Sequence, residues 1–380
     1  MRSWTTVVLA LSLAVAAGLL VGQEQGPNRE PGTTVARPRK PDTGDAGNPT
    51  DDSDLPKIPS KLSKKNQPDT TGLATFKSDV DVVTVEVSVL DNKGHFIPGI
   101  PPDKFRVLED NVPQPLKGSN MGEAPMTVAM VIEFSARFQQ FYSSTWYQTL
   151  AAAWGFLETL KPDDYVAIVA YDLRPEILTD FTTDKNKARD AMQRLQIPAF
   201  SEANLYDALT DTADRMSGIE GRKAIVLISS GIDTFSKINY GEARKKLQEA
   251  GVPVYPIGLM QALRIMMEAR GMSPLAEMDY LQADNAMKTF ATETGGMAFF
   301  PRFFGEFPTI FQNIQQALRS QYVLTYQPTN KAHDGTFRKI KVQLVDPGTN
   351  EPLKFADQKG KPIKYQIIAK AGYTAPRAVE

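Results

Sequence analysis

Residues 127–137 read TVAMVIEFSAR, and this stretch decides the fold. Its first six residues form a continuous, mostly apolar run without the alternation of apolar and polar positions, and the charged Glu133 follows directly. Runs of this kind are typical of strands buried on both faces of a parallel sheet. Similar runs occur at residues 166–170, 224–228 and 252–257. The pattern predicts a central sheet of buried strands.

Helical segments separate these runs. They are predicted at residues 146–160, 185–195, 205–216, 241–250 and 287–294. Asp184 stands where an N-cap is expected, and Gly251 stands where a C-cap is expected. Strands that alternate with helices over residues 126–321 predict an α/β domain, doubly wound around a mostly parallel, Rossmann-like sheet. In such sheets ligands bind beyond the carboxyl ends of the strands.

The flanking segments have the period of two that is typical of half-buried strands. Such strands are predicted within residues 80–90, 105–108, 322–326, 339–344 and 365–370. Neither flank has enough strands to close a core alone. We therefore expect residues 75–125 plus 322–375 to form one discontinuous, Ig-like β-sandwich, into which the α/β domain is inserted.

Residues 1–22 have the features of a secretory signal peptide, with a positive start and an apolar run of about 15 residues, shorter than the ~20 that span a bilayer. An uncleaved anchor is the alternative. We expect an exported protein, periplasmic or secreted, with no membrane span in the mature chain. Residues 23–74 are rich in Pro and Gly and predict a disordered linker, or a recognition arm.

The composition excludes several classes of function. The 43 Lys and Arg nearly balance the 44 Asp and Glu, so no basic excess favours nucleic acid. The absence of cysteine excludes disulfides and thiolate metal sites. The chain has two histidines, His95 and His333, and both lie in predicted turns, which disfavours a Ser-His-Asp site. With no nucleotide-binding or nucleophile-elbow motif either, we expect no enzyme.

Three segments with polar residues meet at the carboxyl edge of the predicted sheet, at residues 133–137, 202–209 and 228–234. The stretches at 131–137, 205–209 and 225–234 resemble the von Willebrand factor type A (VWA) domain. The chain as a whole resembles VWFA-related proteins that are abundant in Acidobacteria. That wider resemblance covers residues 75–375 and is carried by the segments 79–94, 105–114, 318–330 and 334–342.

The resemblance implies a metal-ion-dependent adhesion site, in which Asp, Ser and Thr oxygens hold a divalent cation. In this chain the opening Asp of that motif falls on Glu133 and the first Ser on Ser135. The second Ser falls on Arg137, which has no acceptor and repels a cation. The last Asp falls on Ser230, which removes a negative charge.

The Thr of the motif falls on Ala203, with Asn204 beside it. Mg²⁺ prefers a compact set of oxygen ligands with carboxylates among them. We therefore expect a degenerate site without a cofactor, with Mg²⁺ binding as the minor alternative. Arg137 either replaces the cation by pairing with Glu133 or points into solvent.

These features predict an interaction or adhesion protein that binds a protein partner, whose identity the sequence does not give. The predicted binding residues at the sheet edge are Glu133, Ser135, Arg137, Asn204, Ser230 and Asp233. The alternatives are a structural scaffold in a periplasmic or envelope complex and, more weakly, a hydrolase. The Met-rich residues 260–284 predict an inserted helix or an adaptable contact surface.

Overall fold

The computed structural model describes residues 82–377, with gaps at 93, 121–124, 137–145, 197–199, 220, 262–263, 266–273 and 357–359. The predicted signal peptide and linker lie outside the described residues, and so does Arg137. Within the described part of the chain, no helix is long and apolar enough to cross a membrane.

The central sheet has five strands in the order β7-β6-β5-β8-β9. They are β5 (Met126–Glu133), β6 (Tyr165–Tyr171), β7 (Pro175–Thr182), β8 (Arg222–Ser229) and β9 (Val254–Gly258). All eight residues of β5 are buried, as expected for the middle strand of a covered sheet. Strands β5, β6, β8 and β9 are parallel, which confirms a mostly parallel sheet. The edge strand β7 was not predicted, and the short turn before it makes it antiparallel to β6.

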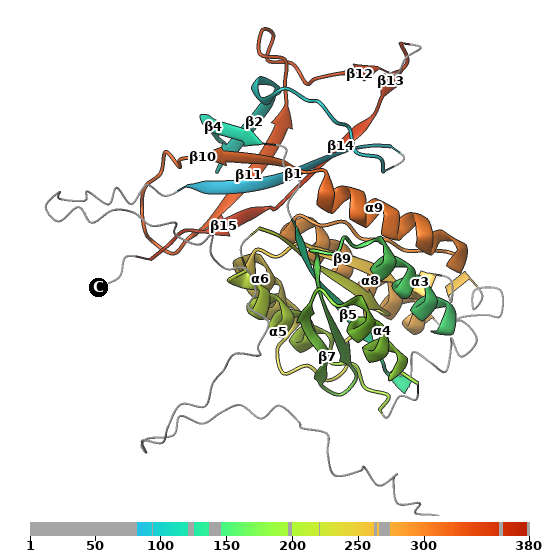
Figure 1. The fold of residues 1–380 in the computed structure, drawn as a ribbon. Coiled ribbons are helices and arrows are strands. Elements are labelled where there is room, and N and C mark those ends of the chain that lie inside the picture. The colour runs from blue at the N-terminus through green and yellow to red at the C-terminus, as the bar shows by residue number, and fades with distance from the viewer. Residues whose placement is uncertain are drawn as a thin grey trace, which may run out of the picture. The chain divides into compact units, whose positions relative to one another are not determined.

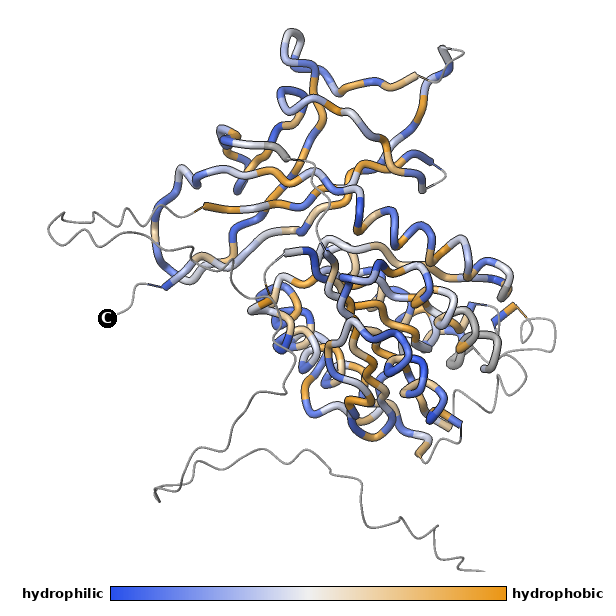
Figure 2. The backbone as a smooth tube through the Cα atoms, in the orientation of Figure 1, coloured by the Kyte–Doolittle hydropathy of each residue, from blue (hydrophilic) through white to orange (hydrophobic). Residues whose placement is uncertain are grey.

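Helices cover both faces of this sheet (Figure 1). One face carries α3 (Trp146–Thr159), α4 (Lys185–Gln193) and α9 (Phe307–Arg319), and the other carries α5 (Leu205–Ser217), α6 (Tyr240–Ala250) and the C-terminal half of α8 (Pro274–Thr294). Alternate residues of β5 serve the two faces: Val128 and Met130 pack in the first core, and Ala129 and Val131 in the second. Figure 2 shows these strands as hydrophobic segments between the helices. The doubly wound arrangement is therefore confirmed.

Most helix ends follow the sequence signals. Asp184 caps α4 by accepting from the backbone N–H of Asn186, and Gly251 ends α6 in the left-handed conformation. Two differences are notable. Helix α8 begins at Pro274 and joins the predicted helix 287–294 to the end of the Met-rich stretch 260–284, where an inserted helix was predicted. Helix α9 was not predicted. The apolar spacing of Phe307, Ile310, Phe311, Ile314 and Leu318 is the signal that could have found α9.

Two further antiparallel sheets are built from both flanks of the α/β segment (Figure 1). The first, in the order β14-β1-β10-β4, contains β1 (Val83–Asp91), β4 (Leu116–Asn120), β10 (Tyr322–Tyr326) and β14 (Tyr365–Ala369). The second, in the order β15-β11-β2-β3, contains β2 (Phe105–Glu109), β3 (Val112–Gln114), β11 (Phe337–Leu344) and β15 (Gly372–Thr374). A small hairpin joins β12 (Phe355–Ala356) to β13 (Pro362–Ile363).

Strand pairing links the two flanks directly. Strand β1 pairs with β10, and β2 pairs with β11, so each sheet needs residues from both sides of the α/β segment. The four alternate valines of β1 share one hydrophobic cluster with residues of β2, β10 and β11. The turn after Glu109 holds Asp110 and Asn111 at positive φ, as a tight hairpin requires. That both sheets form one β-sandwich domain, into which the α/β domain is inserted, stays a prediction.

A buried carboxylate fastens the amino-terminal edge of the central sheet. Asp164 is fully buried and accepts hydrogen bonds from the N–H of Met126 (2.9 Å) and the N–H of Lys161 (2.6 Å). The guanidinium of Arg319, at the end of α9, donates to the same carboxylate at 2.6 Å. Asp164 therefore joins the start of β5, the turn before β6 and the end of α9.

We predict that Asp164→Ala lowers the free energy of unfolding by about 3–5 kcal/mol, because it leaves a partly buried Arg319 cation and two N–H groups without their acceptor. The neighbouring Asp163 is exposed, so Asp163→Ala should change stability by less than about 0.5 kcal/mol. Urea unfolding of both variants measures the difference. Equal stabilities would contradict the role of Asp164.

Candidate functional site

The carboxyl ends of three adjacent strands bring polar side chains together. Glu133 ends β5, Tyr171 ends β6 and Ser229 ends β8. Glu133 lies opposite Tyr171 in the strand register, and the residue before Glu133 lies opposite Ile228. Glu133 is only 2% exposed, and Tyr171 and Ser229 are also buried. The sheet therefore places a carboxyl group inside the protein at the edge where ligands of this fold class bind.

Hydroxyl and amide donors surround the Glu133 carboxylate. Ser135 Oγ donates to Oε1 at 2.8 Å. Ser230 donates to Oε2 through both its backbone N–H and its Oγ, each at 2.7 Å, and Ser229 Oγ donates to the same oxygen at 3.0 Å. The Tyr171 hydroxyl lies 3.4 Å from Oε2. We call Glu133, Ser135, Tyr171, Ser229 and Ser230 the carboxylate cluster.

Further hydrogen bonds orient the donors of the carboxylate cluster. The Tyr171 hydroxyl donates to Ser229 Oγ at 2.7 Å, and the backbone N–H of Gly231 donates to the same oxygen at 2.8 Å. The N–H of Ile232 donates to Ser230 Oγ at 3.2 Å. Burial raises the pKa of Tyr171 well above its usual value, and the neighbouring Glu133 charge raises it further. Tyr171 therefore remains a protonated donor at neutral pH.

A second polar network holds the start of α5. Asp233 Oδ1 accepts from the N–H groups of Leu205 (2.8 Å) and Tyr206 (3.2 Å). Ser236 Oγ accepts from the N–H groups of Tyr206 (3.0 Å) and Asp207 (3.2 Å). The free N–H groups of a helix start are thus satisfied by a loop distant in sequence.

Asn204 occupies the N-cap position of α5 but makes no capping hydrogen bond with its side chain. Its amide nitrogen donates instead to Asp207 Oδ2 at 3.2 Å. The same oxygen of Asp207 accepts from the N–H of Lys237 at 3.0 Å. Asn204 and Asp233 therefore belong to a network that fastens the loop after β8 to α5.

That loop, residues 230–239, is fixed on several sides. Thr234 and Ala203 exchange two hydrogen bonds, from Thr234 N to Ala203 O and from Ala203 N to Thr234 Oγ1, both at 2.8 Å. Phe235, which lies between the hydrogen-bonded residues Thr234 and Ser236, is 56% exposed. A large aromatic side chain thus projects from a loop whose backbone is held in place.

The predicted site residues fall into two neighbouring groups. Glu133, Ser135 and Ser230 lie together in the carboxylate cluster, while Asn204 and Asp233 are joined through Ser236. Arg137 lies outside the described residues, so its pairing with Glu133 stays a prediction.

Sequence reasoning missed Tyr171, Ser229, Asp207, Ser236 and Phe235. The first two close buried strands, which is a signal that could have found them. In the Met-rich stretch, Met278 is exposed on α8, while Met266, Met267 and Met272 lie outside the described residues.

The residues at this edge do not fit Mg²⁺. The carboxylate cluster holds one carboxylate, whose two oxygens already accept from Ser135, Ser229 and Ser230. Asp233 is committed to the N–H groups of α5, and Ala203 supplies no side-chain oxygen. Over the described residues, no group of three or more His, Asp or Glu side chains is arranged to hold a metal. A hard cation needs more oxygen ligands than these residues leave available.

Residues 128–232 match the family model of the von Willebrand factor type A domain. The chain therefore contains a VWA-like domain, and the resemblance inferred from the strand ends is confirmed. The finer assignment to the group abundant in Acidobacteria stays a prediction. A comparison with curated proteins found no match.

Several solved structures are similar over part of the chain. Proximal thread matrix protein 1 from the mussel byssus is 14% identical, with a TM-score of 0.40 over 52% of this chain and 49% of that chain. The vWF domain of the type V pili tip protein Mfa5 from Porphyromonas gingivalis is 14% identical, with a TM-score of 0.39 over 52% of this chain and 97% of that chain.

The PilB minor pilin from Streptococcus sanguinis is 12% identical, with a TM-score of 0.39 over 52% of this chain and 63% of that chain. This chain thus spans about half of the length of the mussel protein. At these values the likenesses carry no conclusion about function.

We predict that Glu133→Gln lowers the free energy of unfolding by about 1–3 kcal/mol and that Glu133→Ala lowers it by about 3 kcal/mol or more, because buried donors lose their acceptor. Glu176→Gln, at an exposed position of β7, is the matched control and should cost less than about 0.5 kcal/mol. Urea unfolding gives all three values. An unchanged free energy of unfolding in Glu133→Ala would show that the carboxylate cluster does not stabilise the sheet.

We also predict that Asp233→Ala destabilises the protein by about 1–2 kcal/mol, because it removes the acceptor for two N–H groups of α5. Hydrogen exchange should locate the effect in the amides of Leu205 and Tyr206. Asp214→Ala, at an exposed position of the same helix, should leave these amides protected. Unchanged protection in Asp233→Ala would rule out the capping role.

Proposed function

We propose that this chain is an exported, non-enzymatic protein that mediates protein–protein interaction or adhesion through the carboxyl edge of its central sheet, without a bound metal. The observation that carries the proposal is Phe235, which is 56% exposed on a loop fixed by hydrogen bonds to α5. Aromatic residues on pre-organised loops lose little entropy on binding and often dominate the energy of an interface.

The carboxylate cluster supports binding without a metal. In the adhesion site implied by the family, a cation would draw the loops at this edge together. Here Glu133, whose side chain is one methylene longer than Asp, reaches Ser229 at the end of β8 and Ser230 directly after it. It thereby holds those strand ends itself. We infer that the site is a degenerate form of the metal-dependent site, in which hydrogen bonds replace coordination.

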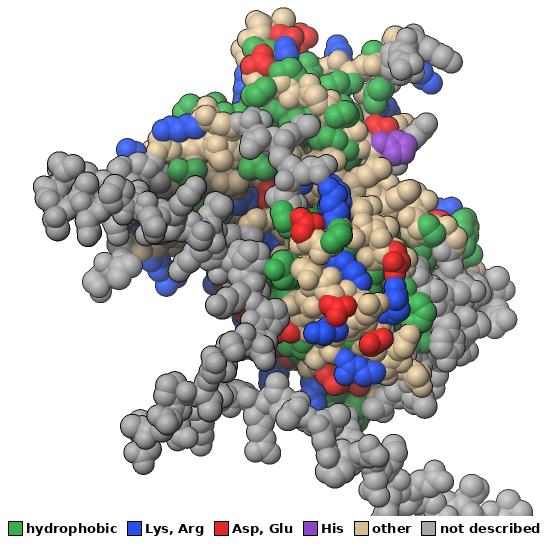
Figure 3. Space-filling view, viewed as in Figure 1, with side chains coloured by type: hydrophobic (Ala, Val, Ile, Leu, Met, Phe, Trp, Pro, Cys, Tyr) green, Lys and Arg blue, Asp and Glu red, His purple; other side chains and the backbone are tan. Residues whose placement is uncertain are grey.

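Two observations favour a protein partner and disfavour catalysis. The hydroxyls of Ser135, Ser229 and Ser230 are buried and donate to Glu133, so the cluster presents no exposed nucleophile. Among the described residues on the face drawn in Figure 3, basic and acidic side chains are interspersed and form no basic stripe for nucleic acid. Export is proposed from the features of residues 1–22. It would place the interaction with a protein partner outside the cytoplasm.

The function is tested by affinity capture with the purified chain, from the extracellular and envelope fractions of its source, followed by mass spectrometry. We expect Phe235→Ala to weaken binding of the captured protein by ~30-fold, as truncation of a dominant contact does. Ile177→Ala removes another exposed apolar side chain, 40% exposed on β7, and should leave binding unchanged. Binding that survives Phe235→Ala would refute the proposed contact.

We further predict that Mg²⁺ and Mn²⁺ do not raise the melting temperature of the chain and that EDTA does not release the partner, since only ligands of the native state stabilise it. The quadruple variant Glu133→Asp, Arg137→Ser, Ala203→Thr, Ser230→Asp restores the oxygen ligands of the family motif. Its melting temperature should rise saturably with Mg²⁺. If Mg²⁺ or Mn²⁺ raised the melting temperature of the chain without substitutions saturably by several degrees, the metal-free proposal would be overturned.

A further inference from the structure

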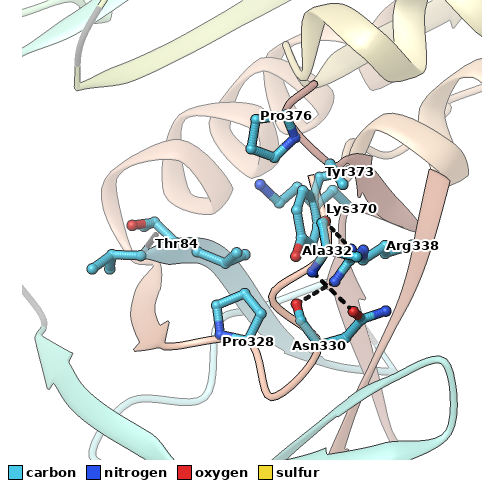
Figure 4. A pocket seen from close by; sticks show the side chains of 11 residues that line it. Thr84, Pro328, Asn330, Ala332, Arg338, Lys370, Tyr373 and Pro376 are labelled. Atoms are coloured by element: carbon cyan, nitrogen blue, oxygen red, sulfur yellow. Dashed lines mark hydrogen bonds between the residues drawn. The ribbon is translucent and has the colours of Figure 1, made fainter. Parts of the chain in front are cut away.

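A cavity of about 340 Å³ lies in the part of the chain built from the two antiparallel sheets (Figure 4). Its walls come from the start of β1, the loop between β10 and β11, the start of β11, and the segment from Lys370 to Pro376. This volume is at the lower end of the range for small-molecule sites. No residue of the carboxylate cluster lines it, so the cavity is separate from the proposed interaction edge.

The lining is cationic. Lys370 and Arg338 both line the cavity, and none of the lining residues is an Asp or Glu. Arg338 is 2% exposed and donates to the backbone oxygens of Asn330 and Ala332, as Figure 4 shows. Its guanidinium also forms ion pairs with Glu109 at 3.4 Å and Asp334 at 3.7 Å, and neither carboxylate is among the lining residues.

Two of these cationic groups have a nitrogen that no acceptor in the described part of the chain contacts directly. Within the described residues, the Nε of Arg338 has no hydrogen-bond partner, and Lys370 takes part in no ion pair or hydrogen bond. Burial lowers the pKa of Lys370, while the Glu86 carboxylate of the neighbouring strand acts in the opposite direction. A half-buried ammonium without a hydrogen-bonded partner is costly, and an anionic ligand would offset that cost.

The rest of the lining is mostly apolar. Val83 and Pro328 contribute aliphatic surface, and Tyr373 contributes an aromatic ring. The Tyr373 hydroxyl donates to Glu109 at 3.0 Å, outside the lining. Apolar walls with few convergent polar groups suit a ligand that is mostly hydrocarbon. A phosphate dianion would need more donors than Lys370 supplies, whereas a carboxylate carries a single charge.

We propose that this cavity, the β1–β11 pocket, binds a carboxylate attached to a small apolar group, with Lys370 pairing the carboxylate and Val83, Pro328 and Tyr373 enclosing the apolar part. Such a group occurs in a free short-chain carboxylic acid and at the C-terminus of a peptide that ends in an aliphatic residue. The pocket would then act independently of the interaction edge.

Isothermal titration calorimetry of the purified full chain with three probes tests the proposal. The probes are butyrate, the tripeptide Ala-Ala-Val with a free C-terminus, and the same tripeptide as its C-terminal amide. We expect saturable binding of at least one free carboxylate in the millimolar range or tighter, and no binding of the amide. Butyrate binding alone identifies a free acid as the ligand class, and tripeptide binding alone identifies a peptide terminus.

Variants locate the site. Lys370→Met keeps the length of the side chain without its charge and should weaken binding about tenfold or more. Ala332→Phe keeps both cations but fills part of the cavity, and it should also weaken binding. Lys364→Met removes an exposed lysine outside the pocket and should have no effect. Equal binding of acid and amide, no binding of either acid, or unchanged binding in Lys370→Met would each overturn the proposal.

Discussion

The buried carboxylate of Glu133 is the constraint on which the carboxyl edge of the central sheet depends. A charge that is 2% exposed must be satisfied by donors. Here they come from Ser135 just after β5, Tyr171 at the end of β6 and Ser229 at the end of β8. Meeting that requirement fixes Ser230, and the loop that continues from Ser230 carries Asp233 and Phe235. One electrostatic requirement inside the protein thus determines the shape of the surface above it.

The central sheet could be predicted from sequence because its signals are local. Residues 127–132 form a run typical of a strand covered on both faces, and Asp184 and Gly251 mark the ends of two helices. Helix α9 has an equally regular apolar face and was overlooked. Strand β7 is different, because more than half of its residues are polar or exposed and its place at the sheet edge depends on pairing with β6.

The candidate site was predictable only in part, for a physical reason. Position-by-position comparison found Glu133, Ser135 and Ser230. It treated them only as metal ligands: Ser135 as intact, Glu133 as conservatively changed and Ser230 as a lost charge. The donors Tyr171 and Ser229 come from other strands, and which hydroxyl points to which oxygen depends on the register of three strands. Asp233 likewise serves a helix about thirty residues earlier in the chain, which no local pattern reveals.

The pairing of β1 with β10 and of β2 with β11 also has a consequence for how the chain folds. Strands β1 and β2 are synthesised first, yet their partners follow only after the whole α/β segment. Until then their edges are open to pairing with other chains. The α/β segment, whose neighbouring strands are close in sequence, can fold first and shorten the loop between the two flanks. It would thereby act as an internal assembly aid for the sheets around it.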